Sequence, residues 1–336
     1  MSRKALVLLF LLFVFCPTSA KRPALAQQVK KVPELHGKIE TTLELERRAT
    51  EGLWAFDFPL YAELSLQYKS NRVLSMFSFD YYNSPSLGDT YIMGGEGNSI
   101  LKLGYFRENW GEGYSTSSVD ILNKWDSRYP QTIFFQRMRS PNPLFILSKG
   151  NEKVWGEIAL AQSGDFESIN DALAGFRAVY SGNGFGLGTG MIRAMGYPPP
   201  LFFLTLRRET EVYRVWAEVS FLYLSESPDR WNAILGMRRL LQAASVLAEF
   251  SILHSSPILF LEEKVIIRKS VEFSLGIFTY LETFSSAINT SFSVTVDEKT
   301  SGEIGGYIFF GKEGSFFSRF EGENYNTIYM KLKYGF

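Results

Sequence analysis

The feature that most constrains this chain is an alternation of apolar and polar residues that recurs along most of its length. In residues 213–223 the odd positions are Tyr, Val, Ala, Val, Phe and Tyr, whereas Arg, Trp, Glu and Ser fill even positions. Residues 62–69 follow the same rule. Successive side chains of a β-strand point to opposite faces, so each segment predicts a strand with one apolar and one polar face. Beyond residue 26 no apolar run is long enough for a transmembrane helix, which argues against a helical inner-membrane protein.

The first 26 residues have the layout of a secretory signal peptide. Arg3 and Lys4 precede an unbroken apolar stretch, residues 5–15, and small residues follow it. Cleavage is expected after Ala20 or after Ala26. The single cysteine lies inside this segment, so the exported protein needs no disulfide. Residues 27–37 are expected to form a short polar periplasmic lead-in.

Composition excludes several functions. The 35 Lys and Arg residues balance 35 Asp and Glu residues, and a chain without a basic excess is not expected to bind nucleic acid. Two histidines and one cysteine leave little material for a metal centre, and no metal-ligand cluster is visible. We therefore expect neither a metal site nor a cofactor.

The C-terminal residues alternate without a break up to the terminal carboxylate. The apolar positions are Ile328, Met330, Leu332, Tyr334 and Phe336. A last strand of this kind resembles the closing strand of bacterial outer-membrane β-barrels, and the resemblance implies that the barrel-assembly machinery reads it. It also implies an all-β fold, a single closed antiparallel transmembrane β-barrel over residues 38–336, embedded in outer-membrane lipid.

The number of strands follows from the turns. Backbone groups in lipid must all be paired, so the sheet must close. Counting back from a periplasmic C-terminus, with short periplasmic turns and longer external loops, gives 18 strands. Residues 90–95 and 258–263 are short for spanning strands, which need about 9–11 residues, and residues 232–250 also suit a helix. We therefore expect about 16 strands, with 14 to 18 allowed, and a barrel of this size leaves an aqueous channel.

The polar faces carry both signs of charge. Opposed rows of charge across a lumen would set a weak ion selectivity, and ion pairs along the wall would stiffen it. The two roles are compatible. The lumen-facing charges expected from the alternation are Glu40, Glu44, Glu63, Lys69, Lys102, Lys153, Glu157, Arg177, Arg214, Glu218 and Glu272.

The longest stretch without alternation is residues 108–130. Long external loops can fold inward and narrow a pore, although an ordinary surface loop would have the same appearance. The candidate constriction residues are Glu108, Glu112, Asp120, Lys124, Asp126 and Arg128. Trp110-Gly111-x-Gly113, followed by acidic residues at 120 and 126, also resembles a segment of outer-membrane barrels for polysaccharide export or capsule attachment.

Five glycines recur at a spacing of two residues between Gly182 and Gly190. This spacing differs from the dinucleotide-binding fingerprint. It predicts a strand face with room for a neighbouring side chain, an inward loop or a bend.

An enzymatic function is not expected. His254-Ser255-Ser256 resembles the His-x-Ser pair of outer-membrane phospholipases. A nucleophilic serine needs a base that a third group orients, and no Asn follows at a suitable distance. Pro257 also follows the pair directly.

These observations predict a porin-like channel in the bacterial outer membrane for passive diffusion of small hydrophilic solutes, with weak ion selectivity. The alternative is a structural or surface-attachment barrel with a plugged lumen that anchors polysaccharide or a surface layer. Porins often form trimers, so a homo-oligomer is a candidate assembly, although no interface is visible in the sequence.

Overall fold

The computed structural model describes residues 34–47, 54–57, 60–69, 73–82, 84–113, 124–125, 139–162, 172–194, 200–222, 231–253, 255–311 and 326–335. The predictions on the signal peptide, His254 and Phe336 lie outside these residues. Among the described residues, no helix combines the length and the apolar character needed to cross a membrane.

The described strands form one large antiparallel sheet of 20 strands and a separate pair. Two strands of the large sheet, β2 (Trp54–Asp57) and β5 (Ser84–Leu87), have four residues each, which leaves 18 long strands. The separate pair is β8 (Lys124–Trp125) with β9 (Arg139–Ser140). The long strands are β1 (Glu34–Arg47), β3 (Leu60–Lys69), β4 (Val73–Tyr82), β6 (Thr90–Glu96), β7 (Ser99–Phe106), β10 (Asn142–Gly150), β11 (Val154–Gln162), β12 (Ala172–Gly182), β13 (Phe185–Ala194), β14 (Leu201–Glu209), β15 (Tyr213–Leu222), β16 (Trp231–Leu240), β17 (Ala244–Leu253), β18 (Ser256–Arg268), β19 (Val271–Tyr280), β20 (Ser285–Thr295), β21 (Thr300–Phe310) and β22 (Asn326–Gly335).

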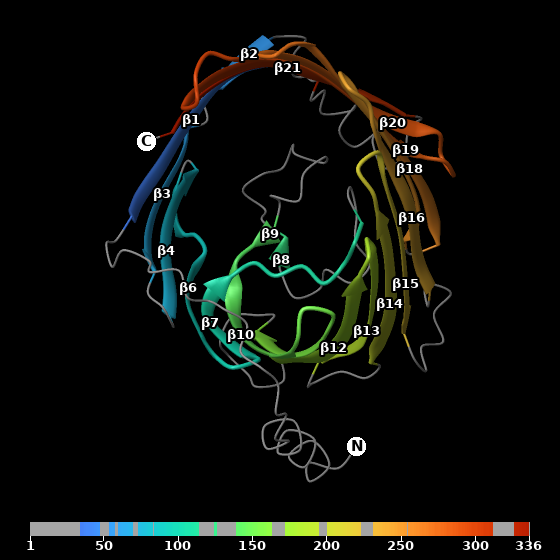
Figure 1. Ribbon diagram of the computed structural model, residues 1–336. Helices are drawn as coiled ribbons and strands as arrows, with labels where there is room; N and C mark the ends of the chain where they lie inside the picture. Colours follow the sequence, from blue (N-terminus) through green and yellow to red (C-terminus); the bar gives the residue numbers. More distant parts are fainter. Residues whose placement is uncertain are drawn as a thin grey trace.

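The pairing of these strands closes into a ring (Figure 1). β22 returns to pair with β1 from Lys38↔Gly335 to Arg47↔Asn326, and the other edge of β1 pairs with β3. Both edges of the first strand are therefore occupied, and the antiparallel sheet closes as expected of a barrel. The prediction of an all-β antiparallel barrel is confirmed.

The 18 long strands lie at the upper end of the expected range of 14 to 18, because both doubtful hairpins form. β6 pairs with β4 and β7 although it is short, and β18 extends over 13 residues. Residues 232–250 form a hairpin of β16 and β17 rather than a helix, paired from Ala233↔Ile252 to Leu240↔Ser245. The burial of both strands has period two over most of their length, with buried side chains on the inner face and exposed ones, mostly apolar, on the outer face, as a strand of the wall requires.

All connections at one end of the barrel are short turns, whereas most connections at the other end are longer, except for residues 254–255 and 281–284. The β12–β13 turn has two residues, Asn183 and Gly184, with φ of 52° and 73°. This is the geometry of a type I′ turn, for which Asn-Gly is the preferred sequence. The start of β1 and the end of β22 lie at the same end as these turns. β1 begins at Glu34, inside the segment expected to be the lead-in.

The two faces of the wall differ as the alternation predicts. On β22, Ile328 and Leu332 are 51 % and 54 % exposed, whereas Thr327 and Tyr329, at alternate positions, are buried on the inner face. Many inner-face side chains on β15–β22 are apolar and buried, and we call them the inner apolar cluster. Its members are Trp216, Ile234, Leu247, Ile258, Phe260, Phe278, Ala287, Tyr307, Phe309 and Tyr329.

The glycine repeat makes room for neighbouring side chains. Of its five glycines, however, only three lie on the same face of one strand. Gly186, Gly188 and Gly190 lie on the buried inner face of β13, whereas Gly182 ends β12 and Gly184 lies in the turn. A Cβ on Gly190 would lie 2.6 Å from the ring of Phe203. The turn interrupts the repeat, which spacing alone does not reveal.

Candidate functional site

After β7 the chain leaves the wall and runs inside the barrel (Figure 1). We call residues 107–113 the inner segment. They contact side chains of β12, β14 and β15, strands that lie far from β7 in the sequence. Part of the stretch expected to fold inward therefore lies against the inner wall.

Trp110 anchors the inner segment to β12–β14. Its side chain is buried, and its ring centroid lies 6.0 Å from that of Phe203. A Cβ on Gly175 would lie 2.9 Å from the indole ring, so the missing side chain of Gly175 creates the space that the ring fills. The guanidinium of Arg177 lies 5.2 Å from the ring centroid, within the range of a cation–π contact.

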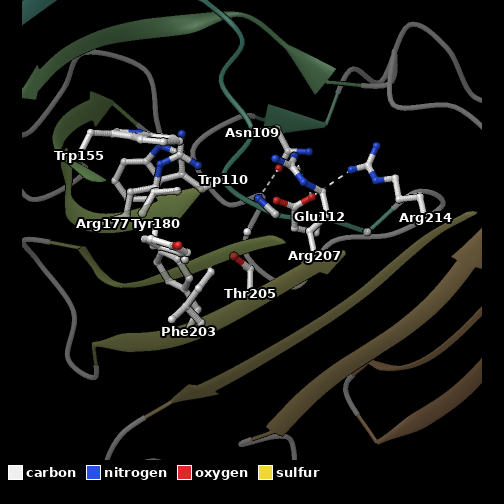
Figure 2. Close-up of a pocket in the computed structure, with 16 residues that line it drawn as sticks. Asn109, Trp110, Glu112, Trp155, Arg177, Tyr180, Phe203, Thr205, Arg207 and Arg214 are labelled. Atoms are coloured by element: carbon white, nitrogen blue, oxygen red, sulfur yellow. Dashed lines mark hydrogen bonds and ion pairs between the residues drawn. The ribbon is translucent and has the colours of Figure 1, made fainter. Parts of the chain in front are cut away.

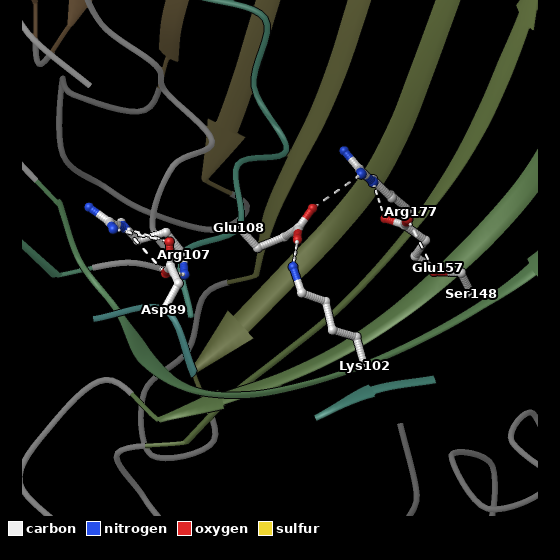
Figure 3. A network of polar contacts seen from close by, with 7 residues as sticks. All are labelled: Asp89, Lys102, Arg107, Glu108, Ser148, Glu157 and Arg177. Carbon is white, nitrogen blue, oxygen red and sulfur yellow. Dashed lines mark hydrogen bonds and ion pairs between the residues drawn. The ribbon is translucent and has the colours of Figure 1, made fainter. Parts of the chain in front are cut away.

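Glu108 joins the start of the inner segment to two strands of the wall (Figure 3). Its carboxylate lies 3.4 Å from Lys102 Nζ and 3.9 Å from Arg177 Nη2. Arg177 also pairs with Glu157, which accepts a hydrogen bond from Ser148. Burial raises the pKa of Glu108, although Lys102 and Arg177 act in the opposite direction. The preceding residue, Arg107, binds Asp89 through its guanidinium at 3.0 Å.

Glu112 makes the corresponding contacts at the other end of the segment (Figure 2). Its carboxylate lies 3.0 Å from Arg214 Nη2 and 3.6 Å from Arg207 Nη1. The backbone N–H groups of Glu112 and Gly113 both donate to Glu218, at 2.8 and 3.4 Å. Glu218 is fully buried, so its carboxylate holds the segment instead of lining open water.

A cavity of about 400 Å³ lies between the inner segment and the wall (Figure 2). Its charged lining consists of Glu112 together with Arg177, Arg207 and Arg214. Gly186 and Gly188 line it without side chains. Arg207 was not among the expected lumen-facing charges, because both faces of β14 are apolar over most of its length, which hides the alternation.

A second, smaller cavity of about 130 Å³ lies against β18–β22. Its acidic residues are Glu262, Glu272 and Glu303. Lys264 pairs with Glu262 at 3.4 Å, and Lys333 pairs with Glu303 at 3.4 Å. This side of the inner wall therefore also carries carboxylates bonded to cations.

The other predicted site residues lie as follows. Glu63 lies on the inner face of β3, and Glu272 lies on the inner face of β19. On β1, Glu40 pairs in register with Lys333 of β22, and Glu44 pairs with Tyr329. Lys69 is exposed at the end of β3.

Lys153, expected to face the lumen, lies in the turn between β10 and β11. Asn151 Oδ1 accepts hydrogen bonds from the N–H groups of Lys153 and Val154. β10 ends at Gly150 and β11 begins at Val154, so Lys153 lies on neither strand and its side chain is exposed. Asp120, Asp126 and Arg128 lie outside the described residues, and for Lys124 only the backbone in β8 is described.

Comparisons with known proteins identify the fold. No family model matches the chain, and no curated protein matches it either. Solved structures do match over most of their length. OccAB4 of Acinetobacter baumannii is 8 % identical with a TM-score of 0.59, and the match covers 92 % of this chain and 99 % of that one. OmpF of Salmonella typhi, solved in complex with daunomycin, is 10 % identical with a TM-score of 0.54 and coverages of 90 % and 97 %. A mutant of the Rh. blastica porin is 11 % identical with a TM-score of 0.55 and coverages of 91 % and 100 %. The chain has a porin-type β-barrel fold.

Proposed function

We propose that this chain, with its porin-type fold, is a bacterial outer-membrane channel through which small hydrophilic solutes diffuse passively. The observation that carries the proposal is the inner segment, which is bonded to the inner wall of an 18-stranded barrel. Barrels of 16–18 strands are wide enough for an aqueous channel, and a segment inside narrows it. The chemistry of such a site is selection of solutes rather than catalysis.

Weak ion selectivity is part of this proposal. Glu108 and Glu112 each contact two cations of the wall, so acidic and basic groups alternate around the inner segment and neither sign of charge lines it alone. Balanced charge gives little preference for cations or anions. Asp120, Lys124, Asp126 and Arg128 remain proposed constriction residues together with these two glutamates.

The proposal includes a location and partners. Residues 1–26 would direct export, and the apolar outer face of the wall would contact lipid. The alternating C-terminal strand would be recognised by the barrel-assembly machinery, and the barrels would assemble as a homo-oligomer, as porins that form trimers do.

Single-channel conductance of the refolded protein in a planar lipid bilayer tests the function. Stable current steps of nanosiemens order are the expected result. A folded barrel that changes mobility on heating but passes no current would refute the channel.

One observation favours the alternative, a structural or surface-attachment barrel with a plugged lumen. The inner apolar cluster faces inward, yet its side chains are buried from water. A wide water-filled lumen at that level would hydrate them at a cost in free energy. The same bilayer measurement separates the two functions.

A further inference from the structure

Arg207 and Arg214 lie on neighbouring strands and share one carboxylate. Both guanidinium groups contact Oε2 of Glu112. The side chains of Arg207 and Arg214 are 33 % and 39 % exposed, whereas that of Glu112 is 20 % exposed. Both arginines line the cavity beside the inner segment, so parts of their guanidinium groups remain open to it (Figure 2).

Three arginines lie close together at this end of the wall, and in the part of the chain that the structure describes two carboxylates form ion pairs with them. Arg238 on β16 lies in register opposite Arg214, and its guanidinium donates to the neutral hydroxyl of Ser245 at 3.5 Å. Like charges directly opposite on one face of a sheet are destabilising. Among the described residues, the carboxylates in ion-pair contact with these arginines are Glu112 and, at 4.0 Å from Arg207, Glu209. A further anion would reduce the repulsion.

The cavity has room for such an anion. Gly186 and Gly188 line it beneath the arginines, and neither carries a side chain. A volume of about 400 Å³ falls in the range of small-molecule sites. Guanidinium groups match carboxylate and phosphoryl oxygens in a forked geometry, which makes these groups the chemistry that fits.

We infer that Arg207 and Arg214 form a binding site for the carboxylate or phosphoryl group of a small solute, and that Glu112 occupies this site as an internal competitor when no solute is bound. The inference rests on the proposed channel for the route by which a solute reaches the cavity. The two arginines then bind either the solute or the carboxylate of Glu112, but not both at once.

Calorimetric titration of the refolded protein in detergent tests this inference, with inorganic phosphate and acetate as separate probes at constant ionic strength. E112Q keeps the shape of the side chain and removes its charge. We expect it to bind at least one probe about tenfold more tightly than the unchanged protein, the size of one charge-assisted hydrogen bond. R207Q in the E112Q background should abolish that binding. R208Q is the matched control, because Arg208 is the next residue on β14 and is exposed on the opposite face.

Equal affinity of E112Q and the unchanged protein would overturn the inference, as would a loss with R208Q as large as that with R207Q. If E112Q does not refold, R214K replaces it, since lysine keeps the charge but lacks the fork. R214K should bind the probe more weakly than the control R208K, and equal binding would overturn the inference. The probe that binds identifies the group. A silent barrel that binds phosphate would refute the channel alone, and a conducting barrel that binds neither probe would refute the inference alone.

Discussion

The backbone N–H of Glu112 donates a 2.8 Å hydrogen bond to the carboxylate of Glu218, a residue 106 positions further along the chain. Glu218 is fully buried on the inner face of β15 and also accepts from Gly113. Two amides therefore meet one buried carboxylate, and the end of the inner segment is held at a defined place on the wall.

Replacing this acceptor should loosen the segment. E218Q removes the negative charge from a buried acceptor and should lower the free energy of unfolding by roughly 1–3 kcal/mol. We expect noisier single-channel current and an earlier midpoint of urea unfolding. E263Q is the control, because Glu263 is exposed on β18. Quiet current and an unchanged midpoint in E218Q would show that these hydrogen bonds do not position the segment.

The packing of Trp110 depends on a missing side chain. G175A would place a Cβ 2.9 Å from the indole ring and 3.2 Å from Ile192. Overpacking of this kind should destabilise the barrel by about 1–3 kcal/mol and shift the current steps. G302A is the matched control, since the nearest atom to its Cβ would be in Leu332 at an ordinary 3.6 Å. If G175A and G302A both have the same free energy of unfolding as the unchanged protein, the packing of Trp110 does not depend on this space.

Ion selectivity should respond to mild acid. Burial raises the pKa of Glu108, so on acidification this group takes up its proton before an ordinary glutamate does. The inner wall then loses a negative charge, and the preference for anions should increase as the pH falls through this range. Reversal potentials in a KCl gradient at several pH values measure the change. E108Q should lack this first step, and an identical titration of E108Q and the unchanged protein would exclude Glu108 as its source.

The proposed assembly signal predicts a difference between cells and detergent. F336A should reduce the amount of folded, heat-modifiable barrel in the outer membrane several-fold, because the assembly machinery would meet an incomplete signal, whereas refolding in detergent does not involve that machinery. Refolding in detergent should be nearly unchanged. A control such as Y325A, upstream of β22, should leave both amounts as they are. Equal loss of F336A in cells and in detergent would point to a folding defect instead.

On most strands, the alternation of the sequence determined which residues face inward. Glu157, Arg177 and Arg214 all occupy inner-face positions that period two predicts. The turn at Asn183-Gly184 also depends only on local sequence, since both residues adopt positive φ readily. These properties depend on backbone geometry and on neighbours a few residues away, so they can be read without the fold.

The tertiary structure decided what the inward residues meet. Glu218 was expected to line the lumen, yet the inner segment covers it, and Arg214 reaches a carboxylate 102 residues away. The number of strands also depended on the ring, because the short β6 is paired along both edges, with β4 and with β7. Periodicity specifies a face, but it contains no distance between segments. Closure of the barrel sets those distances, and only then does a charged side chain become an anchor, an ion-pair partner or part of a channel wall.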